Sequence, residues 1–378
     1  MDYSKSDERE ITELIKRLIN IPSVTGNKNA NLKALNVVKD FLGNKATLRK
    51  FVKDNVISYL FSNSRDFMKP KILFYAHLDV VDVGNNQKLF QPDLKGKILK
   101  GRGACDMKGQ AAILIWCFHQ ILLNNKDASI ALLLVTDEEV GGFNGAKYVI
   151  EQGLKPEILF LPDGGENFNI VLSEKAPHHI TIEAKGIGGH ASRAFELDNP
   201  LNRIFAFYEE AREKFNIADK KNTWASTFEM TTIECDNQSK NKIPSAAKAT
   251  FSWRWPLEQI KFKIGRKEII RIVKKNGCVV LAEEGWGEGT LIDEKNKYLQ
   301  KWKKIIDSNL NKKAKFIQSH GASDARHFFN SKKFGTKNII ITSPICGGLH
   351  SDNEWIDINS LLTMGRSLVT FVNNFFLQ

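Results

Sequence analysis

Short, strongly apolar runs separated by polar or glycine-rich sequence constrain the fold of this chain most. Three of them, KILFYA (71–76), SIALLLVT (129–136) and EILFLP (157–162), have the length and composition of buried β-strands. The mostly apolar stretch MKGQAAILIWCFHQILL (107–123) predicts a largely buried helix between the first two strands. NIIITSP (338–344) repeats the strand pattern late in the chain. Buried strands that alternate with helices favour an α/β fold with a mostly parallel sheet covered by helices on both faces.

A different pattern interrupts these buried strands. In HHITIEAKG (178–186) and AAKATFSWRW (246–255), apolar and polar residues alternate, which is typical of strands with only one covered face. The sequence therefore predicts a smaller α+β domain at 177–288, inserted into a larger domain that is formed by 1–176 and 289–378.

Composition and segment lengths exclude several classes of protein. The chain of 378 residues is long enough for two domains. Its N-terminus lacks the apolar core of a signal peptide, and its longest apolar stretch (111–123) falls short of the roughly 20 residues of a membrane span. The 5 cysteines are widely spaced and odd in number, so no disulfide framework is expected. We therefore expect a cytoplasmic protein that does not bind membranes.

The net charge of +12 raises the question of a nucleic-acid partner. The lysines are scattered, and the densest group, KFKIGRKEIIRIVKK (261–275), alternates with apolar residues at helical spacing. This pattern indicates a solvated helix face, so no nucleic-acid partner is expected. A positive field can still attract an anionic substrate.

Histidine and carboxylate residues follow the predicted strands, at the edge where open α/β sheets place their sites. Each of these residues alone has an ordinary structural explanation, such as a helix cap or a solvated acid. Together, two imidazoles and several carboxylates at one sheet edge suit a borderline-soft divalent metal such as zinc. The residues that follow strands are His77, Asp79, Glu138, Glu139, Asp163 and His350, and Asp106 lies in the glycine-rich turn GRGACDMKG that leads into the predicted helix.

A series of motifs resembles the M20 family of metallopeptidases and deacylases. The motifs occur in the family's order between residues 74 and 355, so the resemblance covers nearly the whole chain. They are FYAHLDVV, GRGACDMKG, VTDEEVGG, PDGG, GIGGHASR, NKIP, GASDAR and GGLHSDNEW. The resemblance implies a zinc-peptidase-like catalytic domain, with a mostly parallel mixed sheet flanked by helices, and an inserted dimerisation domain that also acts as a lid.

The resemblance also implies two zinc ions per chain, for which cobalt or manganese are possible substitutes. Asp106 would bridge the two ions. One ion would also be held by His77 and Asp163, and the other by Glu139 and His350. Asp79 resembles the aspartate that orients the first histidine ligand by accepting its other ring proton.

In the implied mechanism, Glu138 is the general base that activates water for attack on a metal-polarised carbonyl and then passes the proton to the leaving amine. His190 occupies the place of a histidine that stabilises the oxyanion from the opposite subunit, which implies a homodimer. Further residues match family positions near the carboxylate end of the substrate, or could grip a carboxylate. These are Asn241, Arg254, Ser323, Asp324 and Arg326; a structural ion pair between Asp324 and Arg326 is the alternative explanation for that pair.

Two departures from the family pattern limit the choice of substrate. Asp163 stands where desuccinylases and deacetylases typically carry Glu, and Ala322 stands where desuccinylases usually carry Thr. The leading hypothesis is hydrolysis of an N-acyl amino acid, with a dipeptidase or carboxypeptidase of the same family as the closest rival. A catalytically silent binding protein and a serine hydrolase are the alternatives from other classes; the chain lacks the GxSxG motif of the latter.

Overall fold

A computed structural model describes residues 4–285, 287–310 and 313–376 of the chain. The chain divides into two compact units. The first comprises Met1–Leu172, Ile292–Ser319 and Ser323–Gln378, and the second comprises Ser173–Leu291 and His320–Ala322. In sequence, the second unit is thus inserted into the first.

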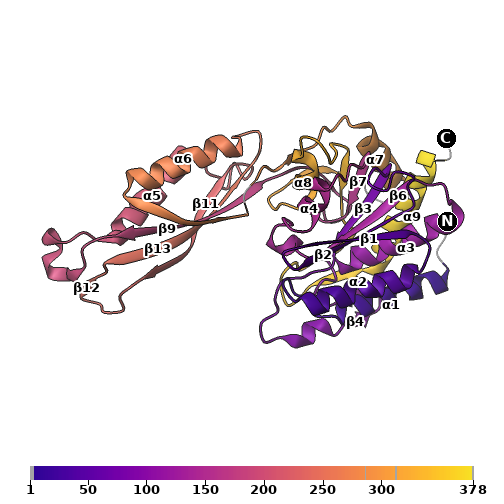
Figure 1. Ribbon diagram of the computed structural model, residues 1–378, viewed down its shortest axis with the longest axis horizontal. Helices are drawn as coiled ribbons and strands as arrows, with labels where there is room; N and C mark the ends of the chain where they lie inside the picture. The colour runs from indigo at the N-terminus through magenta and orange to yellow at the C-terminus, as the bar shows by residue number, and fades with distance from the viewer. Residues whose placement is uncertain (1–3, 286, 311–312, 377–378) are drawn as a thin grey trace. The chain divides into compact units, whose positions relative to one another are not determined.

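The first unit is built on a six-stranded sheet with the order β1-β2-β6-β3-β7-β17 (Figure 1). β6, β3, β7 and β17 run parallel, while β2 joins β6 antiparallel and forms an edge hairpin with β1. The strands are β1 Thr47–Lys53, β2 Val56–Ser62, β3 Ile72–His77, β6 Ile130–Val135, β7 Ile158–Leu161 and β17 Ile339–Ile341. The predicted mixed, mostly parallel sheet is confirmed.

Helices cover both faces of this sheet. Contacts of two neighbouring residues in one strand show this, because neighbouring side chains of a strand point to opposite faces. Phe74 of β3 packs on Phe118 of α3, whereas the next residue, Tyr75, packs on Phe328 of α8. All six residues of β3 and of β6 are buried, which explains their continuous apolar sequence. The helices of this unit are α1 Lys5–Ile19, α2 Lys28–Leu42, α3 Lys108–Asn124, α4 Ala146–Glu151, α7 Lys297–Asn309, α8 Ala325–Asn330 and α9 Ile358–Phe376.

A second, four-stranded sheet of the first unit has the order β18-β19-β5-β4. Trp355 of β19 pairs with Lys100 of β5, so two segments far apart in sequence lie side by side. The strands are β4 Asp93–Lys95, β5 Ile98–Lys100, β18 Cys346–Gly347 and β19 Trp355–Asp357. This sheet therefore joins the chain just before Asp106 to the chain on either side of His350.

The second unit contains an antiparallel sheet with the order β11-β13-β9-β14, and α5 and α6 pack on one of its faces (Figure 1). Apolar residues that alternate along β9 and β13, including Ile180, Ile182, Phe251 and Trp253, are fully buried. The predicted one-sided burial is confirmed. The elements are β9 Ala176–Lys185, β11 Thr227–Cys235, β13 Ala246–Trp255, β14 Cys278–Glu284, α5 Pro200–Lys214 and α6 Phe262–Lys275.

Shorter elements complete the two units. β10 and β12 form a two-stranded sheet, and β8, β15 and β16 form a three-stranded one. Their bounds are β8 Ile170–Glu174, β10 Gly189–His190, β12 Lys242–Ile243, β15 Thr290–Leu291 and β16 Phe316–Ser319, and the 3-10 helices are η1 Gln87–Phe90, η2 Glu138–Val140 and η3 Ala191–Glu196.

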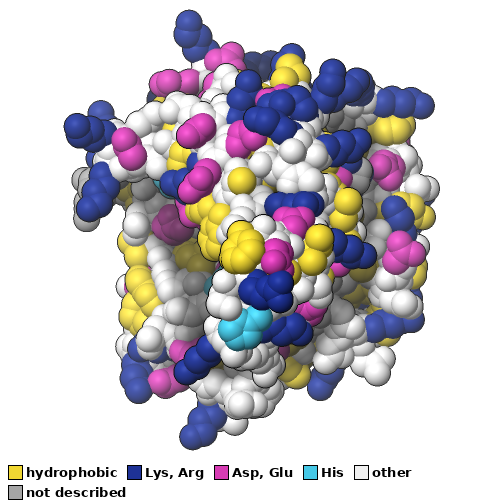
Figure 2. Space-filling model, turned by 90° about the vertical axis from the view of Figure 1, so that its left-hand side faces the viewer, with side chains coloured by type: hydrophobic (Ala, Val, Ile, Leu, Met, Phe, Trp, Pro, Cys, Tyr) yellow, Lys and Arg dark blue, Asp and Glu magenta, His cyan; other side chains and the backbone are white. Residues whose placement is uncertain are grey.

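Charged side chains of both signs are interspersed on the face drawn in Figure 2. Several basic residues of the chain form ion pairs with acidic neighbours, for example Arg266 with Glu283 and Arg271 with Glu268. Lys and Arg side chains lie at many places on the face in Figure 2, with Asp and Glu side chains between them, and do not form a single basic patch. Among the described residues, no helix combines the length and the hydropathy that a bilayer-crossing segment needs.

Candidate metal site

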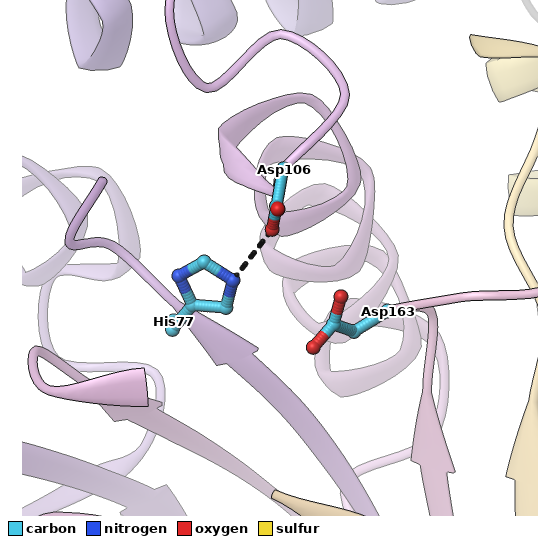
Figure 3. Close-up of side chains that lie close together, drawn as sticks. All are labelled: His77, Asp106 and Asp163. Carbon is cyan, nitrogen blue, oxygen red and sulfur yellow. Dashed lines mark hydrogen bonds and ion pairs between the residues drawn. The ribbon is translucent and has the colours of Figure 1, made fainter. Parts of the chain in front are cut away.

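Three predicted ligands converge at the carboxyl edge of the large sheet (Figure 3). His77 is the last residue of β3, Asp163 follows β7, and Asp106 lies just before α3. Their ligand atoms all lie within 4.8 Å of one another, and His77 Nε2 is 3.0 Å from Asp106 Oδ1. The peptide bond between Asp106 and Met107 is cis.

A second group of potential ligands shares Asp106. It consists of Asp106, Glu139 and His350, again with ligand atoms within 4.8 Å of one another. His350 Nε2 lies 3.1 Å from Asp106 Oδ2 and 3.1 Å from Glu139 Oε2. Asp106 thus turns one carboxylate oxygen to each group, which is the arrangement that a bridging ligand requires.

The residues of both groups fit zinc, which binds imidazole nitrogen and carboxylate oxygen. Glu139 Oε1 is buried and has no hydrogen-bond partner among the described residues, although such an atom is costly to leave unpaired. His350 has a φ of +58°, a backbone conformation that costs a residue other than glycine about 1–2 kcal/mol. Strained backbone and unpaired buried oxygens of this kind are typical of functional sites.

The carboxylates of the site favour positive charge at both histidines. Hydrogen bonds to Asp106 and Glu139 raise the pKa of His350 to about 10. Burial alone would lower the pKa of His77, but hydrogen bonds to Asp106 and Asp79 outweigh it and raise that pKa well above its usual range. A divalent cation bound by either group would therefore have to displace a proton from His77 or His350.

The two neighbouring glutamates, Glu138 and Glu139, have different surroundings. Glu139 belongs to a ligand group and Glu138 does not, among the described residues. Burial, and then the nearby carboxylate of Asp163, raise the pKa of Glu138 well above its usual range. A carboxylate of raised basicity beside the ligands is suited to accept a proton from water.

Asp79 contacts both His77 and the segment that carries the two glutamates. The His77 Nδ1 atom lies 3.0 Å from the main-chain oxygen of Asp79 and 3.5 Å from its carboxylate. The carboxylate also accepts the backbone N–H groups of Glu138 and Glu139, each at 3.3 Å, and the Thr25 hydroxyl at 2.8 Å. Asp79 therefore fixes His77 mainly through its carbonyl, and its carboxylate holds the start of η2.

The predicted substrate residues of the GASDAR motif are buried in the first unit. The exposed fractions of Ser323, Asp324 and Arg326 are 3%, 0% and 5%. Arg326 Nη2 donates a hydrogen bond of 2.7 Å to the carbonyl oxygen of Gly141, and the Tyr75 hydroxyl donates to Asp324. Arg326 thus holds the carbonyl of Gly141 in the segment that follows η2, and the carboxylate of Asp324 lies close to Gly142 in the same segment.

The remaining predicted residues lie in the second unit. His190 in β10 pairs with Lys242 in β12, and the Ala191 N–H donates to the carbonyl of Asn241 at 2.8 Å, so His190 and Asn241 lie close together. Both are exposed. Arg254 is half-buried on β13.

Two features beside Asp106 are not predicted from the sequence. Cys105 forms a disulfide with Cys346, 241 positions away, although the number and spacing of the cysteines predicted no disulfide framework. Sequence spacing offers no signal for such a distant partner. Glu354 is buried against the Asp106 segment and had no predicted role, although it stands in the GGLHSDNEW motif.

The chain is similar to curated bacterial proteins over most of its length. It is 28% identical over 347 residues to succinyl-diaminopimelate desuccinylase of Rickettsia bellii, a match that covers 84% of this chain and 86% of that protein. It is also 28% identical over 337 residues to the protein of the same name from Pelagibacter ubique, covering 84% and 87%.

Solved structures share the fold at lower sequence identity. A tripeptidase from Staphylococcus aureus superposes with a TM-score of 0.78 at 18% identity, covering 98% of this chain and 99% of that one. An M20 family metallo-carboxypeptidase from Sulfolobus solfataricus gives a TM-score of 0.77 at 17% identity, covering 96% and 98%.

The sequence model of peptidase family M20/M25/M40 matches residues 73–374. This range contains both ligand groups and the whole second unit. The resemblance predicted from the motifs is confirmed. The chain belongs to peptidase family M20/M25/M40, a family of metal-dependent hydrolases that cleave amide bonds.

Proposed function

We propose that this chain is a dinuclear zinc amidohydrolase that cleaves the acyl group from an N-acyl amino acid, with Glu138 as the general base. The observation that carries the proposal is the carboxylate of Asp106, which turns one oxygen to His77 and the other to His350. The desuccinylase name of curated relatives at 28% identity supports an acyl group as the part removed.

Zinc ions held by the two groups would supply Lewis-acid polarisation of the scissile carbonyl and acidify a water molecule. Glu138 accepts the proton of that water, because its pKa is raised and its carboxyl group is not needed as a ligand. The same carboxyl group then donates the proton to the leaving amine. Asp79 keeps Glu138 and His77 in a fixed relation through its carboxylate and its carbonyl.

His190 is proposed to donate a hydrogen bond to the oxyanion from the partner subunit of a homodimer. Its Nδ1 atom accepts the N–H of Ser192 at 3.3 Å and lies 2.7 Å from the Ser192 hydroxyl. With Nδ1 engaged as an acceptor, the ring N–H lies at Nε2. That proton is available to an oxyanion, as the role requires.

Arg254 and Asn241 are proposed to bind the carboxylate end of the substrate. A guanidinium can hold a carboxylate through two parallel hydrogen bonds. Because Ser323, Asp324 and Arg326 are almost fully buried, we propose that they contribute to substrate binding by supporting the Gly141 segment.

The test is metal analysis of the purified chain, together with hydrolysis of N-succinyl, N-acetyl and dipeptide substrates before and after chelation. About two zinc ions per chain, and cleavage that chelation abolishes and zinc restores, are expected for N-acyl substrates. Preferred cleavage of dipeptides would move the chain to the peptidase branch. Absence of bound metal and of activity after addition of zinc would favour a silent binding protein, and cleavage that resists chelation would favour a serine hydrolase.

A further inference from the structure

We propose that Glu354 is a positioning residue that holds Asp106 in its bridging orientation by tying the Asp106 segment to the segment that carries His350. This inference rests on the proposed function, since it concerns how the chain keeps its two metal ions. Among the described residues, Glu354 belongs to neither ligand group. Its carboxylate points into the backbone of residues 102–106.

The carboxylate of Glu354 accepts four hydrogen bonds from this short segment. Oε2 accepts from Arg102 Nη1 at 2.7 Å and from the N–H of Gly103 at 3.0 Å. Oε1 accepts from the N–H groups of Cys105 and Asp106, both at 2.9 Å. Glu354 therefore fixes the very peptide unit from which the side chain of Asp106 extends.

A structural ion pair alone does not explain this arrangement. The ion pair with Arg102 involves only Oε2. Three main-chain N–H groups also donate to the carboxylate, one to Oε2 and two to Oε1. Glu354 is 1% exposed, so water cannot replace these bonds without rearrangement of the segment. Hydrogen bonds to a charged acceptor in such a buried place are among the strongest that proteins make.

The same residues connect the Asp106 segment to His350. Arg102 Nη2 donates to the main-chain oxygen of His350 at 3.2 Å, and the N–H of Gly101 donates to the main-chain oxygen of Glu354 at 3.1 Å. His350 lies four positions before Glu354, and its imidazole meets the second carboxylate oxygen of Asp106. Glu354 thus sets the distance between two ligands of one group, and metal sites tolerate only small errors in that distance.

The disulfide between Cys105 and Cys346 joins the same two segments, so it could conceal a loss of the Glu354 contacts. The experiment is therefore done with reduced protein, and with a Cys346→Ser background as a check.

The test compares zinc binding by the wild-type chain, Glu354→Gln and a matched control, Asp352→Asn. Glutamine keeps the size of Glu354 but presents an NH2 group, so one pair of donors loses its acceptor. Asp352 lies on the same segment and undergoes the same charge change, but it is exposed and contacts Asn86. Competition with a chromogenic chelator measures the zinc affinity of each metal-free protein.

We expect Glu354→Gln to lower zinc affinity about 10- to 100-fold, the usual effect of removing a residue that orients a ligand. Asp352→Asn should change it less than about twofold. The visible absorption of the cobalt-substituted protein should also change in Glu354→Gln and not in the control, because those bands report ligand geometry and a merely stabilising residue leaves them unchanged. Urea unfolding verifies that the variant is folded.

Equal zinc affinity and equal cobalt spectra for the folded Glu354→Gln and wild-type proteins would overturn this inference and leave the proposed function intact. A wild-type chain that binds no zinc would overturn both. If Glu354→Gln does not fold, Glu354→Asp replaces it: this variant keeps the charge beside Arg102 but draws the carboxylate back from the N–H of Asp106. It should also lose zinc affinity, and unchanged affinity would refute the role.

Discussion

Replacement of Gly142 by alanine tests how rigidly Asp324 and Arg326 hold the segment that follows η2. Gly142 has a φ of +67°, and a Cβ atom there would lie 1.8 Å from Asp324 Oδ1. Real Cβ contacts are essentially never shorter than 3.0 Å, so the carboxylate or the segment must move by about 1.2 Å, the difference of these two distances. Asp324 is fully buried and accepts a hydrogen bond from Tyr75.

The cost has two parts. The left-handed backbone costs an alanine about 1–2 kcal/mol. Displacement of Asp324 weakens a buried hydrogen bond to a charged group, which contributes about 1.5–3 kcal/mol. The sum of about 2.5–5 kcal/mol is a large share of the roughly 5–15 kcal/mol by which a folded domain is stable. Because the moving segment carries Glu138, we also expect kcat to fall at least about tenfold.

Gly96→Ala is the matched control. Gly96 has a φ of +60° and lies in the same unit. Apart from its chain neighbours, no described residue has an atom within 4 Å of an added Cβ, so the variant carries only the backbone cost of about 1–2 kcal/mol. Calorimetric unfolding of both variants measures the difference, which should be about 1.5–3 kcal/mol. Equal destabilisation of the two variants, with unchanged kcat in Gly142→Ala, would refute the argument that Asp324 is held rigidly beneath this segment.

Three further predictions concern the site and its surroundings. Glu138→Gln should lower kcat by about 10²–10⁴-fold while bound zinc stays unchanged by elemental analysis; complete loss of zinc would show that the two neighbouring glutamates have exchanged roles. The folded metal-free chain binds the protons of His77 and His350 more tightly than the unfolded chain, so this contribution to stability is present below pH 6.5 and is lost as the pH rises through the value of about 10 for His350. Because zinc must displace these protons, its affinity should rise as the pH rises from 6.5 to about 10, and binding should release protons. Titration calorimetry measures this affinity, and an affinity that does not change with pH would contradict the prediction. Alkylation of the unfolded, unreduced chain should leave Cys105 and Cys346 unmodified, and mass spectrometry that finds all five cysteines modified would refute the disulfide.

The sequence by itself determined the strands of the large sheet and the residues placed at their ends. A run such as KILFYA is apolar at every position because both faces of β3 are covered, and that pattern is local. Since the carboxyl ends of parallel strands meet at one edge of a sheet, the sequence alone predicts that His77 and Asp163 lie close together. The alternation in β9 and β13 likewise marked a sheet with one covered face.

Only the tertiary structure decided how distant segments meet around Asp106. His350 lies 244 positions from Asp106. No local sequence pattern indicates that His77 and His350 each contact one oxygen of the Asp106 carboxylate. The hydrogen bonds of Glu354 and the disulfide between Cys105 and Cys346 form because the antiparallel pairing of β19 with β5 brings the two segments together. The burial of Arg326 was equally invisible, because a charged residue is exposed by default and becomes buried only where folding supplies a partner, here the carbonyl of Gly141.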